Sequence, residues 1–141
     1  MNNLYATINE AALKTLIILS LSEKSENIDT IAAIDFISTF GKDYNISSFN
    51  LNGDNTLKVA EFTSRRRTLK KALEFLVINK YITMNNSNNG ISFEIQNEKK
   101  EIVNNISSTY SKEYKNNVIQ TILKYSSYFD NNSIIKLILN K

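Results

Sequence analysis

The sequence FTSRRRTLKKALEFLVINKYITM, residues 62–84, contains the change of hydrophobic period that decides the fold. Apolar residues recur at helical spacing through its first part, where they form one stripe of Phe62, Leu69, Leu73, Leu76 and Val77. From residue 81 to residue 95, apolar and polar residues alternate on both sides of an Asn/Gly turn, which is typical of a β-hairpin. The pattern therefore predicts a helix from about residue 59 to 79 that leads into a hairpin over residues 81–95.

Two further helices are predicted before this stretch. The first begins at Thr7, a favourable N-cap residue, because Glu10 follows it at the spacing of a capping box. A polar connection leads to the second helix, for which either Asn27 or Asp29 is a suitable cap and Gly41 a suitable end.

After the hairpin, residues 98–129 return to helical spacing, with an aromatic and aliphatic stripe that predicts internal packing. The last segment, SIIKLILNK at residues 133–141, is dense in aliphatic residues: Ile134, Ile135, Leu137, Ile138 and Leu139. A helix that is apolar on all sides must be buried on several sides, so we expect a partner subunit or a second copy to cover part of it. A loose β-strand pairing is the alternative.

Three helices, a hairpin and a C-terminal helix follow one another in the order of a winged helix-turn-helix domain. The chain has 141 residues, which fits one domain. The sequence thus predicts a mostly α (α+β) fold, with a winged helix-turn-helix domain over residues 5–97 and a C-terminal helical extension over residues 98–141. We expect both parts to form the same compact unit.

The sequence contains no cysteine and no histidine. Their absence argues against a zinc site and excludes His-based catalysis, and no glycine-rich phosphate loop is present. The segment LNGDNT, residues 51–56, lacks the spacing of a calcium-binding EF-hand loop, so we interpret it as a turn. We expect no cofactor, no metal and no catalytic site.

No apolar run reaches the roughly 18–20 residues that a membrane-spanning helix needs. The N-terminal segment has neither a basic leader nor a small-residue cleavage pattern, so we do not interpret it as a signal peptide. A cytoplasmic location is the resulting expectation.

The net charge of +3 is unevenly distributed. Residues 1–57 carry three basic and seven acidic residues, residues 58–81 carry seven and two, and residues 82–141 carry seven and five. The resulting net charges are −4, +5 and +2. The concentration of positive charge on one segment indicates an anionic partner, either a nucleic acid or an acidic protein surface.

The arginines of the chain are three neighbours in this basic segment. On a helix, Arg65 and Arg66 border the apolar stripe, whereas Arg67 points outward. An internal ion pair with Asp35 or Glu61, a contact to a partner protein and a contact to phosphate are all open interpretations. We favour a structural ion pair for Arg65 or Arg66.

Lys70 and Lys71 extend the outward face of Arg67 into a basic patch. A solvated surface, a partner contact and a DNA-backbone contact are all compatible with this patch. No Asn or Gln lies between Arg65 and Ile78 to recognise adenine edges, so any nucleic-acid contact is expected to be weak, salt-sensitive and directed at the backbone.

Three segments together resemble the middle component of ABC-three-component systems: YATINEAALKTLIIL (5–19), IDFISTFGKD (34–43) and KVAEFTSRRRTLKKALEFLVINKYI (58–82). The family pattern has an aspartate in a core helix, a Gly-Asp turn, and a glutamate before an Arg-Arg pair. A leucine-rich helix then ends in a Gly-Leu-Val-like step. The corresponding residues here are Asp35, Gly41 to Asp43, Glu61, Arg65–Arg66, Leu69, Leu73, Leu76 and Lys80-Tyr81-Ile82.

The resemblance covers about residues 5–95 and includes departures: the loop before Glu61 lacks the family's Pro and His, and Lys58-Val59-Ala60 replaces an Arg-Ser-Gly run. It implies a non-catalytic adaptor in a hetero-oligomer of the Lamassu type of antiviral defence. The adaptor would join an SMC-like, DNA-sensing ATPase subunit to a nuclease-like effector subunit.

The main alternative is a free-standing winged-helix transcriptional regulator that binds DNA as a dimer. The modest net charge and the acidic first third disfavour it. An unrecognised enzyme would need a site built from carboxylates or lysine, and no such cluster is evident in the sequence.

Overall fold

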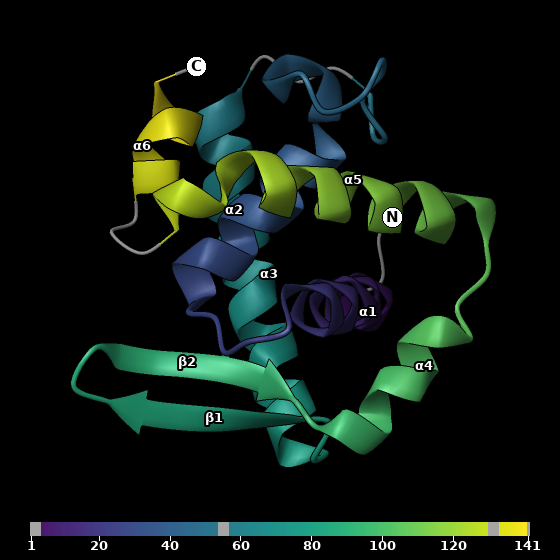
Figure 1. Cartoon of the computed structure of the whole chain (residues 1–141), viewed down its shortest axis with the longest axis vertical. Helices are drawn as coiled ribbons and strands as arrows, with labels where there is room; N and C mark the ends of the chain where they lie inside the picture. The colour runs from purple at the N-terminus through teal and green to yellow at the C-terminus, as the bar shows by residue number, and fades with distance from the viewer. Residues whose placement is uncertain (1–3, 54–56, 130–132, 141) are drawn as a thin grey trace.

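The computed structural model describes residues 4–53, 57–129 and 133–140, with side-chain detail from residue 7 onward (Figure 1). Its helices and strands are α1 (Leu4–Ser22), α2 (Ile28–Thr39), α3 (Lys58–Ile78), β1 (Ile82–Ser87), β2 (Gly90–Ile95), α4 (Lys100–Asn104), α5 (Thr109–Tyr125) and α6 (Ser133–Leu139). Short 3-10 helices lie at Gly41–Tyr44, Asn97–Lys99 and Ser126–Tyr128. The expectation of a mostly helical fold with a small antiparallel sheet is confirmed.

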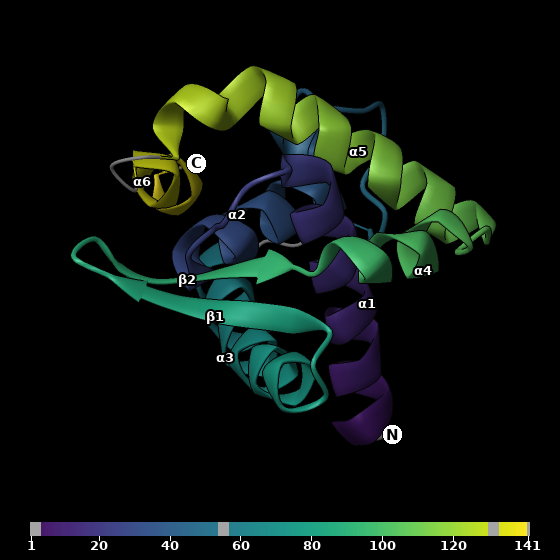
Figure 2. The ribbon, with the colours of Figure 1, turned by 60° about the horizontal axis from the view of Figure 1, so that its bottom comes forward.

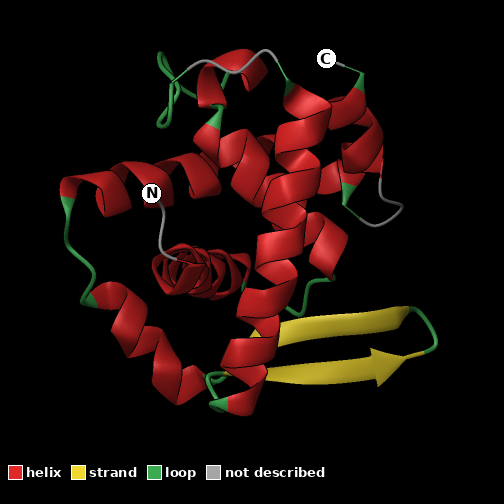
Figure 3. Cartoon of the chain, turned by 180° about the vertical axis from the view of Figure 1, so that it is seen from behind, coloured by secondary structure: helices red, strands yellow, loops and turns green. Residues whose placement is uncertain are grey.

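Helix α2 lies at the centre of the fold, and nine of its twelve residues are buried. Its apolar residues are distributed around the whole helix, so it needs cover on all sides. Helices α1, α3, α5 and α6 supply that cover (Figures 1 and 3). Phe36 lies edge-on to Phe62 of α3, with ring centroids 5.5 Å apart, and also contacts Phe40 and Tyr44.

The cap of α2 is Asn27, whose Oδ1 accepts a hydrogen bond of 2.8 Å from the Thr30 N–H. Asp29, the other residue suited to the cap, is thereby left inside the first turn of the helix. Helix α1 begins at Leu4, so the prediction that Thr7 starts the helix is wrong. None of the helices along the described residues combines the length and apolar character that a membrane crossing requires.

The hairpin is fastened to the helices at two places (Figure 2). Its strands pair with Ile82 opposite Ile95 and Met84 opposite Phe93. At its base, β1 follows directly after α3, as the change of period predicted. Farther out, Phe93 of β2 exchanges two backbone hydrogen bonds of 2.9 and 2.8 Å with Glu26 in the α1–α2 connection.

The expected continuous helical segment over residues 98–129 is interrupted. Helix α4 ends at Asn104, and α5 begins after Ser108, whose side chain accepts a hydrogen bond of 3.1 Å from the Ser111 N–H. Asn and Ser favour helix ends over helix interiors because their side chains bond to nearby backbone groups. The predicted internal packing of the stripe is confirmed at its buried members, Tyr114, Val118, Tyr125 and Phe129.

The last segment is helical, and the alternative of a β-strand is wrong. Ile134 and Ile138 are 0 % and 1 % exposed, because α6 packs against α2 and α3 of the same chain. The expectation that a partner covers these two residues is therefore wrong. Ile135 and Leu137 are half-buried, and Leu139 is exposed.

Lys80 ends α3 in a conformation that glycine adopts more easily. Its φ is +63°, and its N–H donates to the Val77 carbonyl while the Tyr81 N–H donates to the Leu76 carbonyl. These are the two hydrogen bonds of a Schellman motif, in which the left-handed residue is usually glycine.

Replacing Lys80 by Gly should raise the free energy of unfolding by about 0.5–1 kcal/mol, because glycine removes the steric cost of positive φ. Urea denaturation of the full chain measures the change. Asn79→Gly is the control: Asn79 has φ −88° and should gain nothing. Equal stabilisation by both substitutions would contradict the explanation.

Candidate functional site

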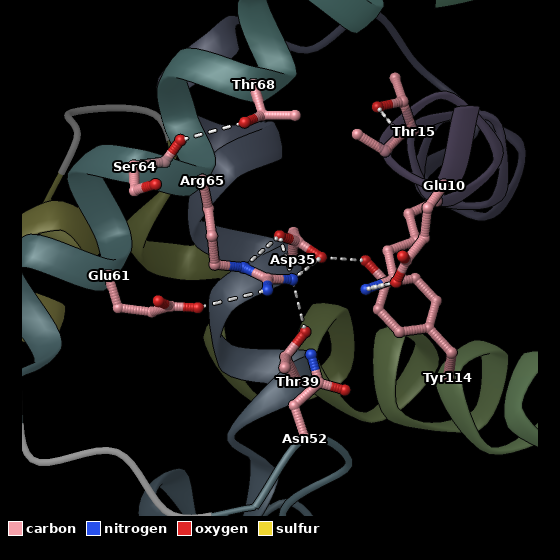
Figure 4. A network of polar contacts seen from close by, with 12 residues as sticks. Glu10, Thr15, Asp35, Thr39, Asn52, Glu61, Ser64, Arg65, Thr68 and Tyr114 are labelled. Atoms are coloured by element: carbon pink, nitrogen blue, oxygen red, sulfur yellow. Dashed lines mark hydrogen bonds and ion pairs between the residues drawn. The ribbon is translucent and has the colours of Figure 1, made fainter. Parts of the chain in front are cut away.

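A polar network joins α2, α3 and α5 around the carboxylate of Asp35 (Figure 4). Arg65 Nε donates to Asp35 Oδ2 at 3.0 Å, and Arg65 Nη2 donates to Asp35 Oδ1 at 3.1 Å. This is the two-pronged geometry that a guanidinium and a carboxylate favour. The Asp35 and Arg65 side chains are only 17 % and 19 % exposed, so the pair lies largely out of solvent.

Three further side chains complete the contacts of this pair. The Tyr114 hydroxyl of α5 donates to Asp35 Oδ1 at 2.7 Å. Arg65 Nη2 donates to the Thr39 hydroxyl at 3.0 Å, and Arg65 Nη1 lies 3.5 Å from a carboxylate oxygen of Glu61, one helical turn away. The charge of each partner is thus matched within the network.

Helix α1 enters the network through Lys14. Its Nζ lies 3.2 Å from the Glu10 carboxylate and 5.3 Å from the ring centroids of both Tyr110 and Tyr114. The Lys14 side chain is only 9 % exposed, so the two rings and the carboxylate replace most of its water.

Lys14 and Tyr114 were not among the residues selected from the sequence. Tyr114 belongs to the stripe predicted to pack internally, and no sequence signal distinguishes a tyrosine that also donates a hydrogen bond. Lys14 is the single charged residue from Ala11 to Leu21, which is the one signal that could have indicated a lysine drawn into the interior.

The network sets the protonation states of its members. Burial alone would raise the pKa of Asp35, but the charges of Arg65 and Lys14 and the hydrogen bond from Tyr114 outweigh burial and hold that pKa below its usual 3.8. Burial and the Asp35 charge raise the pKa of Tyr114 well above 10.0. Burial lowers the pKa of Arg65, yet the Asp35 charge outweighs this and raises it above its usual value.

Arg66 makes a second ion pair between α3 and α2. Its Nε lies 2.7 Å from Asp29 Oδ1, so its partner is neither Asp35 nor Glu61, the two carboxylates proposed from the sequence. The Arg66 and Asp29 side chains are 40 % and 35 % exposed, and such a pair contributes little to stability. Both arginines nevertheless turn toward α2.

Arg67, Lys70 and Lys71 lie on the outer side of α3 and are exposed. None of the three has an ion pair with another described residue. The sequence placed these three side chains outside, and all three are exposed, whereas Arg65 and Arg66 are half-buried.

A cleft of about 280 Å³ borders the network between α1, α2 and α3, with Glu10, Lys14, Asp35, Glu61 and Arg65 in its wall. Each carboxylate in this wall is paired with a cation: Glu10 with Lys14, and Asp35 and Glu61 with Arg65. Along residues 4–53, 57–129 and 133–140, no three acidic side chains gather in a geometry that could hold a metal ion. The arrangement is suited to holding helices in place.

Replacing Asp35 by Asn should lower the free energy of unfolding by about 2–4 kcal/mol, because Arg65 loses its counter-ion in a largely buried position. Chemical denaturation of the full chain measures the loss. Asp29→Asn makes the same change on the same helix at an exposed pair and should cost less than about 1 kcal/mol. Similar losses in both variants would contradict the central position of Asp35.

The decrease in the free energy of unfolding at low pH should depend on Asp35. Because the folded-state pKa of Asp35 is lowered, its stabilisation is complete above pH ~4 and is lost as the pH falls through the lowered pKa. Urea unfolding of Asp35→Asn should therefore change less than that of the unsubstituted protein between pH ~5 and pH ~2. An acid dependence that the substitution leaves unchanged would show that other groups cause it.

Comparison with known proteins identifies the family. Searches of curated proteins and of solved structures find no match. The family model for the ABC-three component (ABC-3C) system Middle Component 2 matches residues 4–141, nearly the whole chain. The chain therefore belongs to the ABC-three component system Middle Component 2 family.

Proposed function

We propose that the chain is a non-catalytic adaptor subunit of a Lamassu-type bacterial defence complex. In this complex it joins an SMC-like ATPase subunit to a nuclease-like effector subunit, and the chemistry belongs to those partners. Membership in a middle-component family carries the proposal, because a middle component implies a system of several components. The paired carboxylates of the Asp35 network support a structural role over a catalytic one.

We further propose that the segment over residues 5–97 is a winged helix-turn-helix domain. Helices α1, α2 and α3 followed by the β1–β2 hairpin have the element order of that fold. The Glu26–Phe93 bridge supports this assignment, because it ties the hairpin to the α1–α2 connection beside the three helices.

The orientation of the arginines favours an adaptor over a DNA-binding regulator. In winged helix-turn-helix proteins the third helix enters the major groove. Here Arg65 and Arg66 of that helix are matched by carboxylates of α2, which leaves Arg67, Lys70 and Lys71 for an outside partner. Three cations on one helix can support a weak backbone contact to DNA, with an affinity that falls as salt rises.

Co-expression of the full chain with the two other components of its system should yield one complex of fixed stoichiometry, purified through a tag on this chain. Size-exclusion chromatography with light scattering measures the assembly. ATPase and nuclease activities should stay with the two partners when each is assayed separately. Recovery of the chain alone, as a homodimer that shifts duplex DNA at low salt, would replace the proposal with the transcriptional regulator.

A further inference from the structure

The apolar face of the hairpin extends beyond the part that the helices cover. Side chains on one face of the hairpin alternate with those on the other, so Ile82 and Met84 of β1 share a face with their partners Ile95 and Phe93 of β2. Ile82, Phe93 and Ile95 are buried. Met84, directly opposite Phe93, is 51 % exposed.

Ile91 continues this apolar face toward the turn and is 49 % exposed. It pairs with the polar Asn86, two residues beyond Met84, so the apolar surface extends farther along β2 than along β1. An apolar face that continues from the core into solvent is typical of a surface that binds another molecule.

Helix α3 forms the other wall of a groove along this face. The groove has a volume of about 500 Å³ and is lined by Ile28, Lys70, Leu73, Glu74, Val77, Ile78, Met84, Ile91 and Phe93. Figure 2 shows α3 lying alongside the hairpin. Ile78, at the end of α3, is 76 % exposed, the largest exposure among the apolar residues in the groove.

The edge of this groove is basic. Lys70 lines it, and Arg67 and Lys71 stand next to Lys70 on the exposed side of α3. These three cations have no ion pair among the described residues. The charges of Lys70 and Glu74 balance within the lining, and Arg67 and Lys71 add positive charge on the adjoining exposed side of α3.

We infer that the groove between α3 and the hairpin docks an amphipathic helix of a companion subunit, whose apolar side chains enter the groove and whose carboxylates face Arg67, Lys70 and Lys71. From Arg67 to Ile78 the exposed side of α3 is about 16 Å long, which is three helical turns of a partner. A partner helix with apolar residues at helical spacing would fill the apolar groove, and acidic residues beside them would pair with the cations at its edge. The inference rests on the proposed adaptor function.

Two other occupants fit the surface less well. DNA would satisfy the three cations, but its phosphates gain nothing from the exposed Ile78, Met84 and Ile91. A second copy bound through the same face by two-fold symmetry would bring two basic edges toward each other, which is unfavourable.

Site-specific cross-linking in the reconstituted three-component complex tests the inference. A photoreactive amino acid replaces Ile78 or Met84 in the full chain, and mass spectrometry identifies the cross-linked peptides. We expect both positions to cross-link to one segment of a companion subunit with apolar residues at helical spacing and flanking Asp or Glu. A photoreactive residue at Leu123, 73 % exposed on α5, is the control and should not reach that segment.

Affinity measurements with the purified companion subunit provide the second test. Ile78→Glu should weaken binding about tenfold or more, because it places a charge in the apolar groove. Lys70→Glu with Lys71→Glu should also weaken binding, with a larger effect at low salt than at high salt. Leu123→Glu is the matched control and should bind like the unsubstituted chain, and circular dichroism melts should show that all variants fold.

The outcomes separate the groove from the adaptor function. If the complex forms but cross-links at Ile78 and Met84 reach a second copy or DNA, or are absent, the groove proposal is wrong and the adaptor function stands. If the chain does not associate with the other components at all, both proposals are wrong. Equal weakening by Ile78→Glu and Leu123→Glu would also overturn the groove as the docking site.

Discussion

The Asp35 carboxylate is the constraint on which the arrangement of the helices depends. It lies in the middle of α2, a helix that is otherwise almost entirely buried, and a charge in that position must be matched. Arg65 from α3 and Tyr114 from α5 supply the matching groups, and Lys14 from α1 adds a nearby positive charge. Four helices therefore meet at one polar centre inside a predominantly apolar core.

This centre also determines which face of α3 is free. Because Arg65 must face α2, the rotation of α3 about its axis is set, and Arg66 comes to face Asp29. Arg67, Lys70 and Lys71 are then turned outward by helical geometry alone. The buried ion pair thereby places the basic surface beside the hairpin, so an interaction inside the core positions a surface outside it.

Local sequence patterns were sufficient to predict the ends of α3, the position of the hairpin and candidate caps for α2. The change of period at residue 81 placed α3 within one residue of its ends and located the hairpin, and Asn27 was one of two suitable caps for α2. Long-range choices could not be predicted in the same way. Arg66 pairs with Asp29 because of the way α3 crosses α2. Helix α6 is buried because it packs against α2 and α3, which lie far from it in the sequence.

The residues that carry the family resemblance acquire a physical meaning in the structure. Asp35, Glu61 and Arg65 are members of one network, and their positions in the pattern are the positions that hold α2 against α3. Lys80 stands where the pattern has a glycine, and its positive φ explains why glycine suits that position. Asp35, Glu61 and Arg65 therefore lie in the polar centre, and Lys80 lies at a helix end.

The choice of arginine at position 65 and lysine at positions 70 and 71 follows from the same division of α3. Arg65 bonds both oxygens of Asp35 and the Thr39 hydroxyl at once, which requires a planar group with several fixed donors. A lysine has one compact ammonium group and could not span these three acceptors. On the outer face Lys70 and Lys71 have no ion pair with another described residue, and a flexible, strongly hydrated ammonium group is well suited to carboxylates on an incoming helix. Arg65 thus stabilises the fold through the geometry of its hydrogen bonds, whereas Lys70 and Lys71 provide positive charge for a partner.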